Sequence, residues 1–256
     1  MLNLDPAAPH GVPAPSGGWR AAVVADVARG PGGAVVLGLD VADRVAHLPG
    51  QHYVVRLRAP DGYTASRSYS VASAPADPLV ELFVERLPDG EVSTFLADVV
   101  EVGDSLEVRG PLGGWFVWDG AVPALGVGGG TGVVPLVSML RHARDVGAAP
   151  LLRLAVSART PALLPYADEL VAAGAVVAFT RGGRAGGGAA GLGAAEPRGE
   201  RPVGRLAAAD LAPLVRPDAT TYVCGSAVFA EAATRLLVGV GVRVDTIRVE
   251  RFGPSG

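Results

Sequence analysis

The sequence predicts an antiparallel β-barrel followed by a doubly wound parallel sheet. In the first half, apolar and polar residues alternate with period two between turns, as in the short strands of a barrel. In the second half, strand-like and helix-like segments alternate, which is typical of a parallel sheet covered by helices. The pattern changes near Trp118-Asp119-Gly120, so we predict a barrel domain at 19–119 and a second domain at 120–256.

Each domain has its own expected elements. Alternation and flanking turns place barrel strands at 20–27, 34–39, 52–58, 68–72, 80–86 and 105–109. Only 93–100 in this half has a helical pattern. In the second domain we expect strands at 124–127, 151–157, 175–180, 221–224 and 247–251, separated by helices at 134–146, 165–173, 206–215 and 228–240.

Two segments are expected to lie outside the packed domains. Residues 1–18 contain four prolines but no basic start and no apolar run, which excludes a signal peptide and predicts a disordered lead-in. Residues 182–202 are rich in glycine and alanine and poor in large apolar side chains, so we expect a flexible loop there.

Composition excludes several classes of protein. The most apolar stretch, 121–140, is interrupted by five glycines and Pro135, whereas a membrane span needs about 20 unbroken apolar residues. We therefore expect a soluble cytoplasmic protein with no membrane contact. One cysteine can form neither an internal disulfide nor a four-cysteine cluster, and four scattered histidines suggest no metal site. A net charge of −3 without a basic stripe argues against a nucleic-acid partner.

Three segments carry candidate chemistry, and the first is Arg67-Ser68-Tyr69-Ser70 on a barrel strand. Alternation sends Arg67 and Tyr69 to the same face. An arginine there can hold a diphosphate bidentately, and a tyrosine ring can stack on a planar heterocycle. An ordinary half-exposed strand would also account for these four residues taken alone.

The second segment, 90–96, opens the barrel helix. Gly90 allows close backbone approach, and Ser93 or Thr94 is expected to cap the helix. Free amides at a helix start bind anions, so the same diphosphate would fit here. A plain N-cap explains the segment equally well.

The third segment, 127–135, joins a strand to a helix and contains four glycines and Thr131. Such a turn places nucleotide phosphates on a helix N-terminus. The spacing is not the usual G-x-G-x-x-G, because Pro135 stands three residues after Gly132. A simple glycine turn is the alternative, but the position after the first strand favours a phosphate loop.

Taken in this order, the segments resemble the ferredoxin–NADP reductase superfamily over nearly the whole chain from Trp19. Arg67 to Ser70 match its R-x-Y-S flavin motif, and 90–94 is similar to its diphosphate motif. Residues 110–113 match its G-P-x-G turn, and 130–135 match its G-x-G-x-x-P nucleotide loop. Residues 224–226 match its C-G-P segment, with serine in place of proline. Residues 249–252 match its closing segment of valine, glutamate, any residue and an aromatic. The resemblance is strongest to bacterial reductases that supply oxygenases or ferredoxins.

The resemblance also implies roles for individual residues. Arg67 and the amides at Ser93 and Thr94 would hold the diphosphate of FAD, while Tyr69 would stack on the isoalloxazine. Ser70 would hydrogen-bond near the hydride-accepting N5, and Phe252 would cover the other ring face. Cys224 and Glu250 would flank the nicotinamide, although Cys224 also reads as a small buried side chain. The remaining implied cofactor contacts are Ser68, Gly90, Val92, Gly130, Thr131 and Gly132.

Residues after the second and third strands of the parallel sheet indicate the nucleotide. An acidic residue after the second strand binds the 2′-hydroxyl of NADH, whereas an arginine accommodates the 2′-phosphate of NADPH. Here Ser157 and Arg159 stand at that point, and Arg181 follows the third strand. We expect NADPH to be preferred over NADH. Solvated surface arginines are the alternative.

The expected function is that of a flavin-dependent oxidoreductase, which accepts hydride from NAD(P)H onto FAD and passes electrons to a ferredoxin or oxygenase component. A stand-alone reductase of free flavin, quinones or other small molecules would share every motif. A binding module without turnover is a further alternative, against which the intact Arg67, Tyr69, Ser70 and Gly130 argue.

Overall fold

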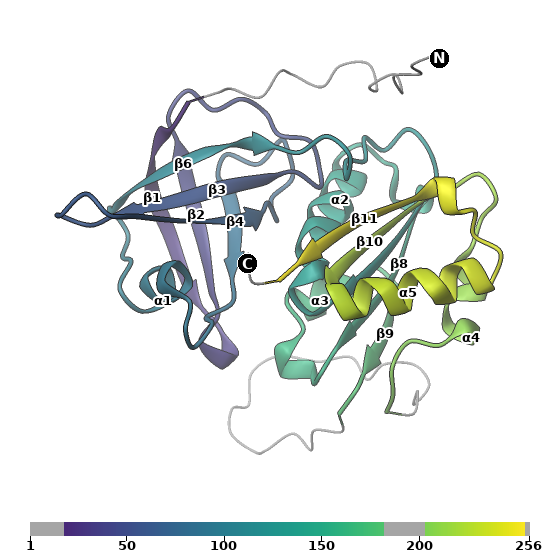
Figure 1. The fold of residues 1–256 in the computed structure, drawn as a ribbon. Coiled ribbons are helices and arrows are strands. Elements are labelled where there is room, and N and C mark those ends of the chain that lie inside the picture. The colour runs from purple at the N-terminus through teal and green to yellow at the C-terminus, as the bar shows by residue number, and fades with distance from the viewer. Residues whose placement is uncertain (1–17, 182–202, 254–256) are drawn as a thin grey trace, which may run out of the picture.

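The protein is described by a computed structural model covering residues 18–181 and 203–253. Two sheets lie side by side, one built from strands before residue 113 and the other from strands after residue 123 (Figure 1). The sequence predictions of a disordered lead-in and of a flexible loop at 182–202 fall outside the described residues, apart from Gly18.

The first sheet is antiparallel and barrel-like, as predicted. Its strands follow the order β4-β3-β6-β1-β2-β5. The bounds are Arg20–Arg29 (β1), Val35–Val41 (β2), His52–Arg58 (β3), Thr64–Ser70 (β4), Val80–Val84 (β5) and Ser105–Leu112 (β6). Alternate residues point inward and bury a core that includes Leu37, Val55 and Leu82. One difference from the prediction is β4, which begins at Thr64 rather than at 68 because it pairs with β3 along its whole length.

This barrel has an opening between its two edge strands. β4 and β5 stand at opposite ends of the strand order, and only an isolated bridge between Val71 and Leu82 joins them. The helix α1 (Glu91–Asp98) contacts both edge strands and buries Leu96 in the barrel core. As an edge strand, β4 is largely exposed along its length.

The second sheet is parallel and covered on both faces. Its order is β11-β10-β7-β8-β9, with bounds Ala124–Gly129 (β7), Leu152–Ala158 (β8), Val176–Phe179 (β9), Thr220–Ser226 (β10) and Ile247–Phe252 (β11). One apolar cluster joins this sheet to α2 (Val134–Asp145) and α3 (Ala167–Ala172). Another joins it to α4 (Ala208–Leu211) and α5 (Ala227–Gly239). The helix expected at 206–215 is shorter, because Pro213 follows α4 and the chain continues as a 3-10 turn.

The strand order reverses between β7 and β10, which are neighbours although far apart in sequence. In open parallel sheets, ligands bind beyond the carboxyl ends of the strands at such a reversal. The glycine loop that follows β7 stands at this point, so the topology makes it a candidate ligand-binding loop. Within the described part of the chain, no helix has the length and apolarity to cross a membrane, and no cluster of metal-ligating side chains occurs.

His47 is a buried histidine of the barrel domain, and its Nε2 lies 3.0 Å from the carbonyl oxygen of Ser73. Its Nδ1 has no hydrogen-bond partner among the described residues. Burial lowers the pKa of His47 to about 4, and the Ser73 bond only partly opposes this shift. The imidazole is therefore neutral at physiological pH.

This histidine should make the fold acid-sensitive. Its pKa is lower in the folded than in the unfolded state, so stability is lost as the pH falls from 6.5 toward 4. We expect its titration to remove about 2 kcal/mol of the free energy of unfolding between pH 7.5 and pH 5. His47→Gln keeps a donor but cannot titrate, so urea unfolding at the two pH values should show a smaller loss. Equal losses in parent and variant would contradict the assignment.

Candidate active site

The motif Arg67 to Ser70 lies on β4, at the edge of the barrel opening. Arg67 is opposite Val55 and Tyr69 is opposite Tyr53, and both partners point into the barrel. Arg67 is nevertheless exposed, and its Nη1 donates to the carbonyl of Ser66 at 2.8 Å. The structure thus places the guanidinium on the same side of β4 as the Tyr69 ring, as alternation predicted.

Tyr69 is partly buried against the barrel core. Burial raises the pKa of Tyr69 to about 12, and the charge of Arg67 opposes the shift. The hydroxyl is therefore protonated at all physiological pH values, and the ring provides an uncharged flat surface beside a cation. This combination suits a planar heterocycle carrying a phosphate group.

Ser70 points to the other side of the strand, opposite His52. Its side chain is buried, yet its Oγ has no hydrogen-bond partner among the described residues. A buried hydroxyl without a partner costs about 1–3 kcal/mol, so such groups usually meet a ligand or water. The observation fits a bound molecule that offers a polar atom at this point.

The start of α1 differs from the prediction. Gly90, not Ser93 or Thr94, is the N-cap residue, and the helix begins at Glu91. Ser93 is buried, with its Oγ donating to the carbonyl of Gly90 and accepting from the amide of Leu87. A Cβ at Gly90 would lie 2.2 Å from that Oγ, which explains the glycine. The Ser93 hydroxyl is thus already hydrogen-bonded to the protein. The backbone amides of the first helical turn, including that of Val92, remain to bind an anion.

A groove of about 860 Å³ adjoins this helix start. It runs between α1 and the hairpin that joins β3 to β4, with Arg58 and Phe95 among its lining residues. The Tyr63 hydroxyl donates to Glu91 Oε2 at 3.1 Å and links hairpin and helix. There is therefore room beside the first turn of α1 for a group larger than a phosphate.

In the second domain, the glycine loop follows β7 as a 3-10 turn at Gly130–Val133 and leads into α2. A Cβ at Gly132 would lie 2.2 Å from the carbonyl oxygen of Cys224, so only glycine lets the loop pack on β10. Pro135 occupies the first turn of α2, where its missing amide removes no helical bond. Gly130, Thr131 and Gly132 thus stand at a helix start at the sheet reversal, as expected for a phosphate loop.

Cys224 and Glu250 lie opposite each other on β10 and β11. Burial, followed by the neighbouring Glu250, raises the pKa of the Cys224 thiol well above its usual value, so the thiol stays protonated. Burial also raises the pKa of Glu250 to about 7, and its buried Oε2 has no partner among the described residues. Near neutral pH the thiol is therefore uncharged while Glu250 is partly ionised, and one carboxyl oxygen is left without a protein partner among the described residues.

Phe252 ends β11 beside Ser226 and is partly buried against the core of the second domain. Figure 1 shows β11 running toward the barrel, so this strand ends on the side of the second domain that faces the barrel. The predicted contact of Phe252 with a flavin face stays a prediction.

The residues expected at the adenosine ribose are brought together. Ser157 is buried at the end of β8 beside Gly129 of the loop. Arg159 and Arg181 are exposed, and the Arg181 amide donates to the Arg159 carbonyl at 2.9 Å. Two arginines from different loops therefore stand next to each other at the carboxyl edge of the sheet, close to the phosphate loop.

Comparisons with known proteins agree with this geometry. Residues 33–117 match the oxidoreductase FAD-binding domain family. The chain is 32% identical over 215 residues to the reductase component of propane 2-monooxygenase from Rhodococcus jostii, covering 80% of this chain and 55% of that protein. It is 41% identical over 124 residues to the glycine betaine monooxygenase reductase subunit of Chromohalobacter salexigens, covering 48% of this chain and 33% of that protein. The chain thus spans about half of the first relative and a third of the second.

The fold has solved counterparts as well. A ferredoxin NADP⁺ reductase from Neisseria gonorrhoeae, solved with bound FAD and NADP, superposes with a TM-score of 0.73 at 18% identity. The match covers 91% of this chain and 98% of that one. Barrel, parallel sheet and their order along the chain are therefore shared over almost the full length. Together with the FAD-binding match in the barrel and the reductase relatives, this shared fold supports membership of the ferredoxin–NADP reductase superfamily.

Proposed function

We propose that this chain accepts hydride from NADPH onto bound FAD and passes the electrons to a separate acceptor protein. The observation that carries the proposal is a pair of buried oxygens without partners, Ser70 Oγ on the barrel and Glu250 Oε2 on the parallel sheet. They belong to the two domains and to the two motifs in which the superfamily binds flavin and nicotinamide. Each fits a ligand atom, and a flavin and a nicotinamide would supply both.

Different residues would bind different parts of the flavin. Arg67 and the first-turn amides of α1 would bind the FAD diphosphate, and the groove beside α1 leaves space for the adenosine half of FAD. Tyr69 would support the flavin ring, with Ser70 donating at its edge. When bound, FAD supplies the hydride acceptor and the ability to release electrons singly, while the protein sets the distance and excludes water.

The partner is proposed from the relatives, which are described as reductase components or electron-transfer components of oxygenases. An oxygenase component or a ferredoxin is therefore the proposed acceptor. We also propose a cytoplasmic location, in keeping with a single buried cysteine and the use of NADPH.

The test begins with the purified protein, which should be yellow and release FAD on heating. NADPH should bleach the flavin absorption without oxygen, and ferricyanide should restore it. Co-purification should then recover an oxygenase component or a ferredoxin that the reduced protein reduces. Release of FMN alone, or rapid turnover with free flavin or quinones and none with any protein, would contradict the proposal.

The choice of nucleotide gives a separate prediction. Because Arg159 and Arg181 lie together beside the loop, kcat/KM should be higher for NADPH than for NADH. Arg159→Ala should lower kcat/KM for NADPH about tenfold, since a charged contact to phosphate is worth about 1.5 kcal/mol or more, and leave NADH nearly unchanged. Steady-state kinetics with both nucleotides measure this. A parent that prefers NADH, or an unchanged ratio in the variant, would refute the assignment.

A further inference from the structure

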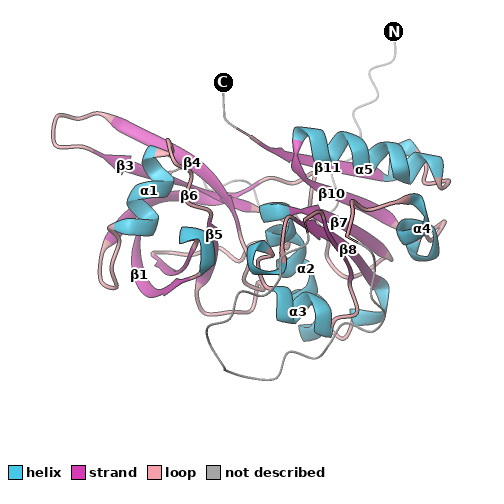
Figure 2. Cartoon of the chain, turned by 90° about the horizontal axis from the view of Figure 1, so that it is seen from below, coloured by secondary structure: helices cyan, strands magenta, loops and turns pink. Residues whose placement is uncertain are grey.

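The helix α2 connects the two binding regions physically. It begins directly after the phosphate loop and lies on the side of the parallel sheet that faces the barrel (Figures 1 and 2). Two of its side chains, Ser138 and Arg141, make hydrogen bonds to the barrel domain. The helix that follows the nucleotide loop is thus attached to the flavin domain at these two positions.

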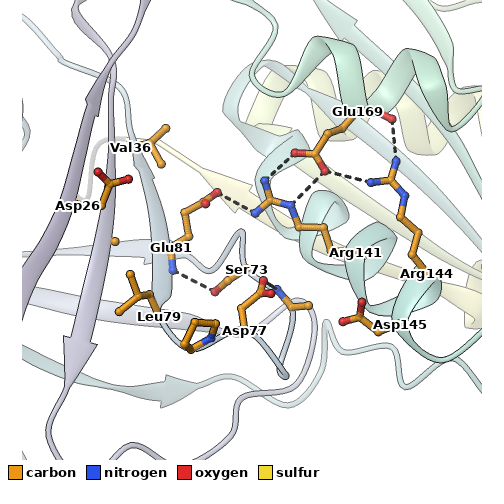
Figure 3. Close-up of a pocket in the computed structure, with 13 residues that line it drawn as sticks. Asp26, Val36, Ser73, Asp77, Leu79, Glu81, Arg141, Arg144, Asp145 and Glu169 are labelled. Carbon is orange, nitrogen blue, oxygen red and sulfur yellow. Dashed lines mark hydrogen bonds and ion pairs between the residues drawn. The ribbon is translucent and has the colours of Figure 1, made fainter.

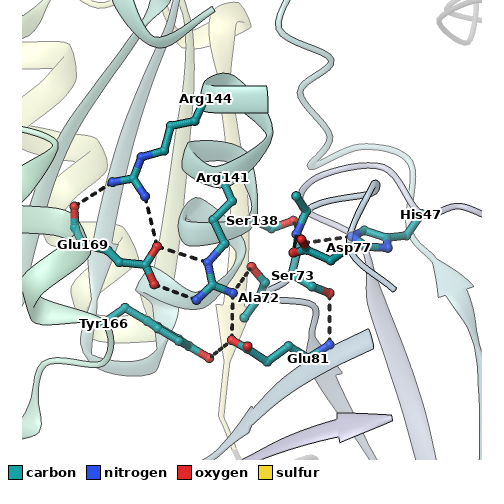
Figure 4. A network of polar contacts seen from close by, with 11 residues as sticks. His47, Ala72, Ser73, Asp77, Glu81, Ser138, Arg141, Arg144, Tyr166 and Glu169 are labelled. Carbon is teal, nitrogen blue, oxygen red and sulfur yellow. Dashed lines mark hydrogen bonds and ion pairs between the residues drawn. The ribbon is translucent and has the colours of Figure 1, made fainter. Parts of the chain in front are cut away.

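Arg141 joins carboxylates from both domains (Figure 4). Its Nη1 donates to Glu81 Oε1 on β5 at 2.8 Å, while its Nη2 and Nε donate to the carboxylate of Glu169 on α3 at 2.6 and 3.1 Å. The Tyr166 hydroxyl donates to the same Glu81 oxygen at 2.8 Å. One guanidinium therefore forms a bridge between the barrel and the two helices on this face of the parallel sheet.

The barrel atoms in this contact lie at the gap between the edge strands β4 and β5, next to the proposed flavin site. Arg141 Nη1 also donates to the carbonyl of Ala72 at 3.2 Å, two residues after Ser70. The amide of Ala72 donates to the carbonyl of Glu81, so one guanidinium spans the continuation of β4 and the edge strand β5. Ser138 adds a bond of 2.7 Å to the carbonyl of Ser73. The segment carrying Ser70 is therefore held by the helix that carries the nucleotide loop.

The network is partly shielded from water and strongly paired. The side chains of Arg141, Glu81 and Glu169 are 20, 28 and 30% exposed. Burial disfavours the Arg141 charge, but Glu169 and Glu81 outweigh it and raise the pKa of the guanidinium, which stays charged. A cavity of about 510 Å³ adjoins the network, lined by Asp26 and Leu79 on the barrel and by Arg144 and Asp145 on α2 (Figure 3). The domains are thus separated by open space next to the bridge.

We propose that Arg141 is a positioning residue for hydride transfer, a proposal that rests on the function proposed above. By fixing α2 to both strands at the flavin opening, it sets the distance between the nicotinamide held by the second domain and the flavin held by the first. It is not among the residues proposed to bind either ligand. Because a misplacement of about 1 Å can slow a reaction about 100-fold, a small change in domain placement has a large kinetic effect without loss of binding.

The experiment is stopped-flow reduction of the FAD-loaded protein by NADPH without oxygen. Arg141→Met keeps the length of the side chain but removes the bridge. We expect the limiting rate constant of flavin reduction to fall at least tenfold, while the apparent Kd for NADPH and the FAD content stay within about threefold of the parent. Arg141→Lys, which can still pair with one carboxylate, should recover part of the rate.

Arg144→Met is the matched control, because Arg144 lies one turn along α2 and binds Glu169 but no barrel residue. Its rate constant should stay within twofold of the parent. A lower melting temperature for Arg141→Met with an unchanged rate constant would overturn the proposal, as would equal losses in both variants. If Arg141→Met does not fold, Glu81→Gln removes the barrel carboxylate from the bridge, leaving the weaker bond to the Ala72 carbonyl, and must lower the same rate constant. A parent whose flavin NADPH does not reduce would overturn the proposed function itself.

Discussion

Arg67→Ala is expected to purify with most of its flavin missing. Arg67 is the cation on the inner side of β4 at the barrel opening, and no other side chain of the R-x-Y-S motif is charged. A charge-assisted contact to a diphosphate is worth about 1.5 to 3 kcal/mol, which corresponds to a Kd for FAD raised about 10- to 150-fold. Absorbance ratios of the purified protein and titration of the apoprotein with FAD measure the change.

Arg109→Ala is a suitable control for this variant. Arg109 is an exposed arginine of β6, and its neighbour Val108 shares the inner side of the sheet with Val55 and Arg67. Side chains alternate along a strand, so Arg109 points to the opposite side. Its loss should leave the FAD content unchanged. Full flavin occupancy in Arg67→Ala, or equal losses in both variants, would place the diphosphate elsewhere.

Most strands and helices could be predicted because their apolar residues recur with the period of a strand or of a helix. The strand β5 alternates buried and half-buried residues, and α2 is apolar and buried over its first two turns. The start of β4 could not be predicted, since Thr64 to Ser70 is a polar edge strand whose pairing partner defines it. The end of α4 depends on Pro213, whose effect a helical pattern alone does not show.

The positions of the site motifs at strand ends and turns could be predicted, whereas their roles in binding stay predictions. The glycine loop after β7 and the pair Cys224 and Glu250 are found where strand ends place them. The cap of α1 was predicted wrongly, because serine and threonine are the usual N-caps, whereas here Ser93 folds back onto Gly90. Spacing could not distinguish a serine that caps a helix from one that closes the preceding turn.

The bridge at Arg141 had no signal in the sequence. Arg141 is 60 residues from Glu81 and 28 from Glu169, and each of the three reads as a solvated charge on its own element. Only the packing of α2 against the barrel brings them together. His47 was likewise read only as one of four scattered histidines, although it is buried against Ser73. Contacts between residues far apart in the sequence depend on tertiary placement, which local patterns do not encode.

Glu250 connects the electrostatics of the site to its pH dependence. Its pKa of about 7 means that near neutral pH the side chain is a mixture of carboxyl and carboxylate. When hydride leaves a dihydronicotinamide, positive charge develops on that ring, and a nearby carboxylate stabilises it whereas a neutral carboxyl does not. The rate constant of flavin reduction should therefore rise with pH through about 7 in the parent.

Glu250→Gln should abolish this rise, because glutamine has nearly the shape of the protonated acid and does not titrate. We expect its rate constant to be only about fourfold below that of the parent near pH 5.5, where little of Glu250 is ionised, and about 100-fold lower near pH 8.5, the usual cost of losing one preorganised electrostatic group. Cys224→Ala is the control, since the pKa of that thiol lies well above this range and its removal should leave the inflection in place. Stopped-flow reduction by saturating NADPH across the pH range measures all three proteins. An inflection that persists in Glu250→Gln would show that another group titrates, and a parent rate independent of pH would show that the Glu250 carboxylate does not stabilise the transition state.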